Sequence, residues 1–407
     1  MLQLNDAFTK LENYLKKENY RGYDPYDTLN SFFPFKSFGK WIPVLAIQFQ
    51  KRNPINIRRF LGIKKEINPK AFGLFLQAYS LLYASTNNKE YLDKANYFFD
   101  WLNANYSKSY SGKCWGYNFP WANQEKYMQP FVPSAVVTGF VVKGLYEYYK
   151  VSDKQEVVDL MKSAALFLDA DLEKFVNESG VSISYTPLQK DICYNASLLA
   201  AESLAKVAAL TNNLNYKETA IKAVDFVIAQ QKSNGCWNYS IDLDLKKEDT
   251  QIDFHQGYVL ESIYEIKTAL NIVNSTWENA ITNGLQFYME QQFNNEGWSY
   301  WRLPKKYPVE IHNQSQGIIT LLKLQGYHPN AGIFAQKIAQ WTITHMQNEK
   351  GYFYYQNHKN FKNKIAYMRW SQAWMFLALT ALVNNDSKGL PQNSINLSGI
   401  KDNLKLT

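Results

Sequence analysis

Two histidines in the second half of the chain each follow an acidic residue by two positions. His255 follows Asp253, and His312 follows Glu310. Histidine exchanges its proton close to neutral pH, so a histidine held beside a carboxylate is suited to general acid or base catalysis. We therefore predict that Asp253, His255 and His312 are catalytic and that the two histidines line one central cavity. The simpler interpretation is that Asp253 caps a helix and that each histidine is buried with satisfied hydrogen bonds.

A pair of acidic residues lies near the N-terminus, in the stretch RGYDPYDTLN. Asp24 and Asp27 could bring two carboxylates over the mouth of the same cavity, as glycoside chemistry requires. Asp27 is therefore a catalytic candidate, whereas Asp24, Tyr26 and Asn30 are substrate-binding candidates. The structural alternative is a proline-centred turn held by Asx hydrogen bonds.

An arginine and a tryptophan, Arg369 and Trp370, open the last apolar segment of the chain. An arginine in apolar surroundings needs an anion. If the anion is a substrate carboxylate or phosphate, Arg369 and Trp370 bind substrate and the glycan is acidic. The alternative is a structural pair with Asp253, Asp27 or Glu310.

Three more polar residues lie at the starts of apolar segments. Tyr194 is a catalytic candidate for proton transfer. Asn195 is either a helix cap or a ligand of sugar hydroxyls. Gln314 is a substrate-binding candidate.

A zinc site is a further alternative. Asp191-Ile-Cys193 followed by His255 resembles the Asp-x-Cys…His zinc set of protein prenyltransferase β subunits, and these ligand types suit Zn²⁺. The sequence lacks a P-loop, GxGxxG, GxSxG, HExxH or CxxC motif and the DxDD motif of terpene cyclases. Our first expectation is therefore that the protein uses no metal and no cofactor.

These residues lie on elements that repeat about every sixty residues. Six apolar segments begin at Asn68, Val132, Cys193, Asp253, Ile311 and Tyr367. Amphipathic segments lie between them and begin at Tyr91, Asp153, Tyr216, Trp277 and Ala331, and the N-terminal helix is the sixth. Alternating buried and exposed helices, repeated six times, predict an all-α fold. It is an (α/α)6 toroid, with six helical hairpins in two concentric rings.

The loops repeat as well. Five of the amphipathic segments are followed by a glycine and then an aromatic residue, as in Gly297-Trp298, which predicts turns and short β-hairpins. All these long loops lead into buried helices, so we expect them on one face of the ring, where a pocket would open. We predict one toroid domain over residues 1–384 with an insertion at about 19–67, followed by a polar tail at 385–407.

The composition is that of a folded protein, with 46% hydrophobic, 20% charged and 16% aromatic residues. Three distant cysteines imply no disulfide framework, and the N-terminus has no apolar signal segment. No stretch reaches the roughly 18 apolar residues of a membrane span. These features predict a cytoplasmic protein. The formal charge of +8 fits a basic surface, an anionic substrate or a membrane surface, and we expect no nucleic-acid partner.

Six stretches are distinctive: YDPYDTLNS, NPINIRRFLGI, NPKAFGLFLQAY, SYTPL with YNASLL, DFHQGYVLESI and YMRWSQAW. Together they resemble a bacterial family of α/α-toroid proteins associated with capsule, exopolysaccharide and O-antigen gene clusters. The resemblance spans essentially the whole chain. It implies surface-polysaccharide biosynthesis, a glycan or a nucleotide- or lipid-linked sugar as partner, and peripheral association with membrane polysaccharide machinery. The architecture is more remotely similar to six-hairpin glycosidases and sugar epimerases, an analogy of fold that carries over no catalytic residue.

Three functions follow from these patterns. The leading prediction is a carbohydrate-active enzyme that performs acid/base chemistry, as an epimerase, lyase or hydrolase. The second is a non-catalytic glycan-binding or assembly protein that uses the same cavity. The third is a zinc-dependent toroid that handles prenyl or lipid groups.

Overall fold

The computed structural model describes residues 2–122, 127–243 and 247–387. The last helix reaches Ser387, so the predicted polar tail from residue 388 onward lies outside the described residues. Within the described ranges, no helix has the length and the apolar run needed to cross a membrane.

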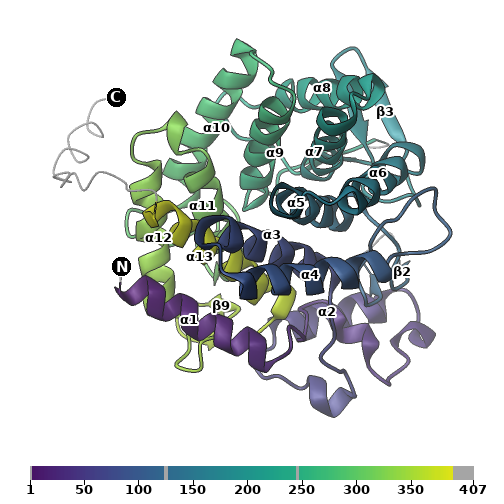
Figure 1. Ribbon diagram of the computed structural model, residues 1–407. Coiled ribbons are helices and arrows are strands. Elements are labelled where there is room, and N and C mark those ends of the chain that lie inside the picture. The colour runs from purple at the N-terminus through teal and green to yellow at the C-terminus, as the bar shows by residue number, and fades with distance from the viewer. Residues whose placement is uncertain (1, 123–126, 244–246, 388–407) are drawn as a thin grey trace.

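Six helices form an inner ring. They are α3 (Pro69–Thr86), α5 (Ala135–Ser152), α7 (Tyr194–Thr211), α9 (His255–Ala269), α11 (Ile311–Lys323) and α13 (Ala373–Ser387). Each packs against the next, and α13 packs against α3, so the ring closes, as Figure 1 shows. Most side chains of these helices are buried, as expected for helices surrounded by others. The predicted (α/α)6 toroid is confirmed.

Six amphipathic helices form the outer ring in Figure 1. They are α1 (Leu2–Lys17), α4 (Lys89–Ala104), α6 (Gln155–Ala170), α8 (Leu214–Ile228), α10 (Ser275–Gln292) and α12 (Ala331–Met346). In α4 the buried side chains are Ala95, Phe98, Phe99 and Leu102, which is the spacing of one helical face. The N-terminal helix α1 contacts both α12 and α13, so it completes the sixth hairpin.

Tight asparagine turns close one face of the ring. Asn87 ends α3 in the left-handed conformation (φ 52°), and Asn88 caps α4 by accepting a hydrogen bond from the Glu90 N–H. Asn212 and Asn213 repeat this arrangement between α7 and α8. Asparagine tolerates the left-handed region and is a good N-cap, so the inner-to-outer links need few residues.

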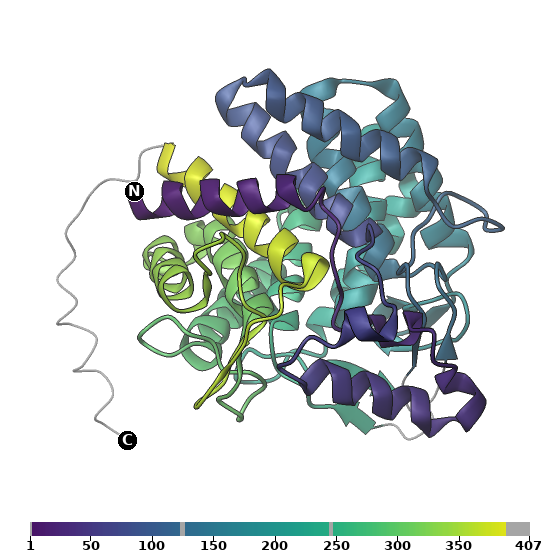
Figure 2. The same ribbon diagram turned by 90° about the horizontal axis from the view of Figure 1, so that it is seen from below.

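The opposite face carries the long loops and their short strands. The strands are β1 (Trp121–Ala122), β2 (Tyr127–Met128), β3 (Lys174–Asn177), β4 (Gly180–Ile183), β5 (Ile192–Cys193), β6 (Ser240–Asp242), β7 (Lys247–Asp249), β8 (Val309–Glu310), β9 (Gln356–Asn357) and β10 (Lys362–Asn363). All pairings are antiparallel: β1–β2, β3–β4, β5–β6–β7 and β8–β9–β10. Figure 2 shows the hairpins gathered on one side of the helices, which confirms the prediction of hairpins on one face.

The glycines of the long loops lie against the backbone of the next outer helix. Gly351 has a φ of 96°, and a Cβ atom there would lie 2.1 Å from the carbonyl oxygen of Lys10 in α1. At Gly180 a Cβ atom would lie 2.1 Å from the carbonyl oxygen of Lys222 in α8. Glycine is therefore required, because any side chain would push the loop off the outer ring.

A repeated side-chain clamp joins each long loop to the inner helix that follows. Gln256 of α9 accepts a hydrogen bond from the Trp237 N–H (2.9 Å) and donates one to the Trp237 carbonyl (2.7 Å). The corresponding residues that accept from a loop N–H are Thr138, Ser197, Gln314 and Gln372. The clamps fix the loops, and with them the side chains at the starts of the inner helices.

The insertion forms a lobe at one edge of the ring in Figures 1 and 2. It consists of η1 (Asp27–Asn30), η2 (Phe35–Phe38), α2 (Trp41–Arg52) and η3 (Arg58–Leu61). Backbone bridges from Gly22 to Glu66 and from Tyr23 to Tyr367 tie it to the ring. Elsewhere, η4 (Gln325–Tyr327) links α11 to α12, and the π-helical turn η5 (Met368–Gln372) leads into α13.

A network of buried charges lies inside the inner ring, in the later turns of its helices. Its members are Lys143, Glu202, Lys206, Glu261, Glu265 and Lys323. Glu202 is the hub, with Lys143 at 3.0 Å and Lys206 at 2.6 Å. Three cations face three anions, so the network is neutral, and mutual attraction offsets the cost of removing the charges from water.

Candidate active site

Asp253 and His255 form a hydrogen-bonded pair at the start of α9. Asp253 Oδ1 lies 2.5 Å from His255 Nδ1 and 3.2 Å from the His255 backbone nitrogen. The other carboxylate oxygen accepts a hydrogen bond from Gln251 (2.7 Å) and lies 3.5 Å from Arg302 Nε. Burial acts to raise the pKa of Asp253, but His255 and then Arg302 more than compensate and lower it. The carboxylate is therefore ionised and fixes the orientation of the imidazole.

The His255 side chain remains partly open to solvent. The His255 side chain is 16% exposed to solvent, whereas the Asp253 side chain is 2% exposed. Asp253 occupies Nδ1, and Nε2 has no hydrogen-bond partner within the described part of the chain. The side chain is therefore mostly buried, but Nε2 is not among the buried polar atoms without a partner and can reach a bound molecule.

Phe254 lies between the two histidines predicted to be catalytic. Its ring centroid is 4.1 Å from that of His255 and 4.1 Å from that of His312. Both histidines also contact Tyr258, at 5.6 and 6.0 Å. The structure therefore brings the two histidines together at the long-loop ends of α9 and α11.

His312 is unlike His255 because it is buried, with only 1% exposure. Its Nε2 lies 2.7 Å from the Tyr258 hydroxyl, and its Nδ1 has no partner among the described residues. Burial, followed by the nearby charges of Lys70 and Arg369, lowers the pKa of His312 well below its usual value. The ring is therefore neutral at pH 7 and is suited to orienting Tyr258 rather than exchanging protons with solvent.

Lys70 is a buried amine that the sequence analysis missed. It lies in the first turn of α3 with 3% exposure, and its Nζ is 4.2 Å from the Phe140 ring centroid and 5.3 Å from that of Trp374. No carboxylate among the described residues forms an ion pair with it. Burial, and then Arg369, lower the pKa of Lys70 well below its usual value. The sequence could have indicated Lys70, because it is a basic residue in the first turn of an apolar segment. Arg369 was singled out for the same reason.

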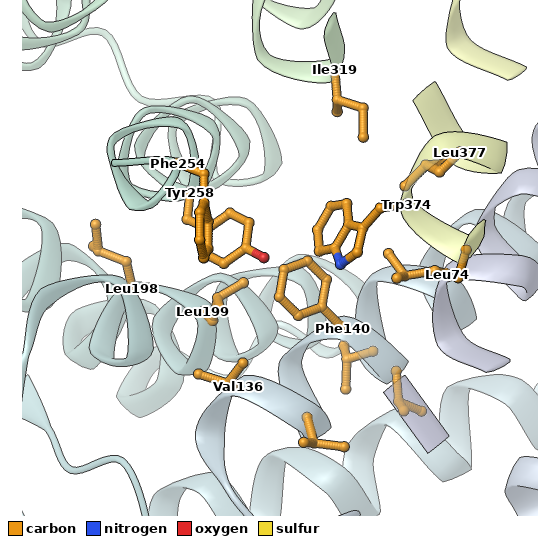
Figure 3. Packing of buried hydrophobic residues seen from close by; sticks show 14 of the residues in the cluster. Leu74, Val136, Phe140, Leu198, Leu199, Phe254, Tyr258, Ile319, Trp374 and Leu377 are labelled. Atoms are coloured by element: carbon orange, nitrogen blue, oxygen red, sulfur yellow. The ribbon is translucent and has the colours of Figure 1, made fainter. Parts of the chain in front are cut away.

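Three aromatic rings form the floor of the site in the middle of the toroid. Phe140 of α5, Tyr258 of α9 and Trp374 of α13 have centroid separations of 5.0–5.6 Å. Figure 3 shows these rings converging from three different inner helices. Phe140 has Lys70 at 4.2 Å and Lys143 of the buried network at 5.9 Å, so the aromatic layer separates the site from that network.

Three tyrosines from the long loops lie near residues of the site, and the sequence analysis did not single them out: Tyr239 lies beside His255, and Tyr117 and Tyr185 lie near Arg369. Tyr117 is hydrogen-bonded to Tyr185, and Tyr239 to Cys193. The Tyr239 ring lies 4.8 Å from that of His255. Each of the three side chains is half-buried, so it can present a ring edge or a hydroxyl to a ligand. The sequence could have indicated Tyr117, because it follows Gly116 in the first of the loops that contain a glycine and an aromatic residue.

Arg369 does not have the free guanidinium expected of an anion-binding residue. Its Nε and Nη2 donate to the two carboxylate oxygens of Asp24, at 2.6 and 2.7 Å. Both side chains are buried, and the bidentate pair neutralises the charge. This geometry favours a structural ion pair over the substrate-binding roles predicted for Arg369 and Asp24. The partner is Asp24, which was not among the structural partners considered from the sequence.

Asp27 is likewise paired within the protein. Its Oδ1 accepts from Arg58 Nε at 2.7 Å, and its Oδ2 accepts from the Asp24 N–H at 2.9 Å. Burial raises the pKa of Asp27 to about 7, against the opposing effect of Arg58. The side chain is buried within the insertion, and these bonds favour a role in anchoring Arg58 and the 24–27 turn over the predicted catalytic role.

Tyr26 and Trp370 lie beside the histidines. Their rings are 5.5 Å apart, and Trp370 is 4.7 Å from His312. Trp370 Nε1 donates to Glu310 at 2.8 Å, and Lys51 of α2 donates to the Tyr26 hydroxyl at 2.5 Å. The insertion thus reaches the last inner helix, and both rings remain substrate-binding candidates.

Tyr194 and Asn195 do not face the histidines. The Tyr194 ring packs toward Phe226 of the outer helix α8, and its hydroxyl is buried without a partner among the described residues. Asn195 is buried and accepts a hydrogen bond from Cys193 Sγ. This placement favours packing between the rings for Tyr194 and a local hydrogen bond for Asn195 over the predicted roles in proton transfer and sugar binding.

The zinc alternative gains no support from the geometry. Asp191 accepts hydrogen bonds from the Tyr185 N–H and from Gln189, while His255 is held by Asp253. Among the residues that the structure describes, no three His, Cys, Asp or Glu side chains are grouped to hold a metal ion.

Gln314 is also a structural residue. Its amide accepts from the Ser299 N–H and donates to the Gly297 carbonyl and the Thr342 hydroxyl, as part of the repeated clamp. It is fully buried, so its predicted substrate-binding role is corrected.

A cleft of about 750 Å³ separates the insertion from the loop that follows α4. Asn30 lines it and donates to Glu66 at 3.3 Å, so this predicted binding residue faces the cleft and not the histidines. Trp101 and Tyr106 provide aromatic walls. Asn30 and Glu66 also line a small pocket that extends to Asp24 and Arg369, so the cleft adjoins the rim of the site.

Solved structures share the fold at low sequence identity. The cellobiose 2-epimerase of Bacillus thermoamylovorans is 14% identical with a TM-score of 0.63, covering 79% of this chain and 88% of that one. The GH76 α-mannanase BT2949 of Bacteroides thetaiotaomicron is 15% identical with a TM-score of 0.61, covering 78% and 86%. The unsaturated glucuronyl hydrolase of Bacillus sp. GL1 is 13% identical with a TM-score of 0.61, covering 94% and 96%. No curated protein matches the sequence.

One family description matches the chain directly: "Beta-L-arabinofuranosidase, GH127 catalytic domain", over residues 10–269. The match begins in α1 and ends in α9, so it includes Lys70, Asp253 and His255 and covers more than half of the 407 residues. The prediction of a carbohydrate-active enzyme is confirmed at this level. The chain belongs to the GH127 β-L-arabinofuranosidase catalytic-domain family.

Proposed function

We propose that this enzyme transfers protons to and from a sugar through His255, which Asp253 orients. The observation that carries the proposal is the 2.5 Å contact between Asp253 Oδ1 and His255 Nδ1, with the rest of the imidazole partly exposed. A carboxylate on Nδ1 selects the tautomer with its proton there and leaves Nε2 as the base. Nε2 then removes a proton from a sugar hydroxyl or carbon, and the carboxylate stabilises the resulting imidazolium.

The other acidic residues at the mouth support histidine chemistry over a pair of free carboxylates. Asp24 and Asp27 are bound by Arg369 and Arg58. Glu310 accepts from Trp370 and from Gln356, both at 2.8 Å. Hydrolysis by two carboxylates requires one group that holds a proton and a second that meets the sugar. Each of these three groups already has partners within the protein.

The substrate we propose is a glycan with an acidic sugar, from surface-polysaccharide biosynthesis. Half-buried Tyr239 and Trp370 offer rings on which a sugar can stack. Lys70 replaces Arg369 as the candidate cation, because a substrate carboxylate beside it would relieve the cost of its unpaired charge. The adjoining cleft of about 750 Å³ has room for further sugar units.

Glycoside hydrolysis is the second candidate, and family membership favours it. In that reaction His255 would activate water or protonate the leaving oxygen. The two candidates differ in product: hydrolysis releases a new reducing end, whereas epimerisation or elimination exchanges or removes a carbon-bound proton.

Two assays test the proposal. The protein is incubated with a chromogenic β-L-arabinofuranoside, and separately with neutral and uronic-acid oligosaccharides in D2O, followed by mass spectrometry for deuterium at carbon. We expect His255→Gln and Asp253→Asn to lower turnover by roughly 10²–10⁴-fold, the usual contribution of an acid/base group. The matched control is His345→Gln, since His345 lies against Trp341 on the outer helix α12. Wild-type turnover by His255→Gln would overturn the proposal.

A further inference from the structure

The insertion exposes an unusual amount of apolar surface. Nine large hydrophobic side chains between residues 32 and 60 are exposed: Phe32, Phe33, Phe38, Trp41, Ile42, Leu45, Phe49, Ile55 and Phe60. The other exposed large hydrophobics are spread over the rest of the described chain. Single exposed apolar residues need no explanation, but a concentration of them marks an interaction surface. We call these nine side chains the apolar face.

Helix α2 carries the centre of the apolar face. Trp41, Leu45 and Phe49 follow one another at four-residue intervals, so they lie on one side of the helix, and they are 54–65% exposed. Ile47 and Gln50, on the opposite side, are buried against the rest of the insertion. The helix therefore carries apolar residues on both sides, since Pro43 and Ile47 are buried on the inner side while the outward stripe has no core to pack on.

The charge of the insertion is as asymmetric as its hydrophobicity. Residues 28–65 contain no Asp or Glu but eight basic residues: Lys36, Lys40, Lys51, Arg52, Arg58, Arg59, Lys64 and Lys65. The formal charge of this segment is thus +8, which equals the net charge of the whole chain. The rest of the protein is therefore balanced, and the excess positive charge lies where the apolar face is. Within the described residues, Arg58 is neutralised by the buried Asp27 and Lys65 pairs with the partly exposed Glu18.

We infer that the apolar face docks the enzyme on an anionic phospholipid surface. An outward apolar stripe with Trp and Phe, flanked by Lys and Arg, is the pattern of a helix that lies in the plane of a lipid interface. Anionic head groups attract the basic residues, and the aromatic rings enter the boundary with the acyl chains. A second copy of the chain is the competing occupant, and the test below distinguishes it from a lipid surface.

Docking at this face would hold the candidate active site beside the lipid surface. Lys51 at the end of α2 donates to the Tyr26 hydroxyl, and the Tyr26 ring lies 5.5 Å from Trp370. The helix that carries the apolar face therefore also reaches the mouth of the site. A substrate attached to a lipid would be presented close to His255, although the docking inference does not depend on catalysis.

Vesicle sedimentation tests the inference on the full chain. Vesicles of phosphatidylcholine with phosphatidylglycerol (3:1) are compared with pure phosphatidylcholine. We expect binding to the anionic vesicles that is at least tenfold tighter and weakens as salt rises, because screening shortens the reach of the charges. The triple variant Trp41→Ser, Leu45→Ser, Phe49→Ser should reduce the binding constant by at least tenfold.

Two matched controls separate the face from general effects. Leu214→Ser with Val273→Ser removes two apolar side chains elsewhere that are more exposed than those of α2, and this variant should bind as wild type does. A second triple variant should bind the vesicles more weakly and with a smaller salt dependence. It combines Lys36→Gln, Lys40→Gln and Arg52→Gln. The same number of changes at the exposed Lys89, Lys217 and Lys337 should have a much smaller effect. Thermal melts of each variant exclude misfolding.

Three results would overturn the inference. One is no binding to the anionic vesicles at low salt. Another is unchanged binding by the triple variant. The third is a wild-type dimer, detected by light scattering, that the triple variant loses while neither protein binds vesicles; this would assign the face to a second copy of the chain. Because no outcome involves turnover, failure here leaves the proposed catalytic function untouched.

Discussion

The buried pair of Asp24 and Arg369 gives the sharpest test of how the site is built. The two groups share bonds of 2.6 and 2.7 Å, and their side chains are 7% and 2% exposed. Two unit charges about 4 Å apart attract by about 4 kcal/mol at an effective dielectric constant of 20. Asp24→Asn keeps the shape but leaves the guanidinium without its counter-charge. We expect the free energy of unfolding to fall by about 3–5 kcal/mol, the usual cost of breaking a buried pair.

A double-mutant cycle separates the ion pair from other effects of the substitution. Arg369→Met alone strands the carboxylate and should cost a similar amount. The double variant removes both charges, so its loss should be at least about 2 kcal/mol smaller than the sum of the single losses. Urea unfolding followed by circular dichroism measures each value, with unchanged slopes as the sign that the midpoints can be compared. The exposed pair of Asp6 and Lys10 is the control, and Asp6→Asn should cost less than about 1 kcal/mol.

Additive losses, or an Asp24→Asn variant as stable as wild type, would refute this reasoning. Arg369 would then not depend on Asp24, and its guanidinium would again be available to a substrate anion. The cycle therefore decides between the structural role of Arg369 and the binding role predicted from the sequence.

Three further predictions concern stability. Burial lowers the pKa of His312 well below 6.5, so the unfolded state binds more protons than the folded state below that pH. Wild type should therefore lose stability as pH falls below about 6.5, by up to about 1.4 kcal/mol per pH unit. His312→Gln should flatten this part of the pH profile of stability, and an unchanged profile would contradict the prediction. Glu202→Gln, which leaves three lysines with two carboxylates in the charged network, should lower the unfolding free energy by about 3–5 kcal/mol, whereas the exposed Glu218→Gln should change it by less than about 0.5 kcal/mol; equal melting temperatures would disprove the difference. Gly351→Ala should destabilise the fold by more than about 1 kcal/mol because its Cβ would meet α1, and Gly326→Ala, where no atom lies within 4 Å, is the control; the reverse order would refute this packing.

The repeat made the ring predictable from the sequence. Asn68 and Asp253 begin apolar segments that became inner helices, and Gly351 marks a loop that docks on α1. The repeat predicts the ring because each hairpin packs against its two neighbours in the same way and therefore needs the same pattern of apolar residues. His255 and His312 come together for the same reason, since equivalent positions of adjacent repeats are neighbours around the ring.

The partners of individual side chains were not predictable in this way. Asp24 and Arg369 are bonded although 345 positions separate them, because the insertion folds back onto the start of the last inner helix. Nothing in the repeat describes where an insertion lies. Tyr194 was misassigned for a different reason: a residue at a helix start can point inward or between the rings, and one turn of sequence does not distinguish these directions.

The internal pairing of Arg369 and Arg58 reduces the number of charged groups that can act on a substrate. With Arg369 and Arg58 occupied by Asp24 and Asp27, these charges hold the insertion in place and are removed from the site. What remains at the mouth is one partly exposed histidine fixed by a buried carboxylate, with the unpaired Lys70 on the floor beneath it. Because the histidine has no second free carboxylate beside it among the described residues, the site favours proton transfer at one sugar unit. Because Lys70 has no counter-ion in the part of the chain that the structure describes, the site favours a substrate that carries a negative charge. In the function we propose, the chemistry depends on two adjacent repeats and the first inner helix, while the other hairpins and the insertion fix their geometry.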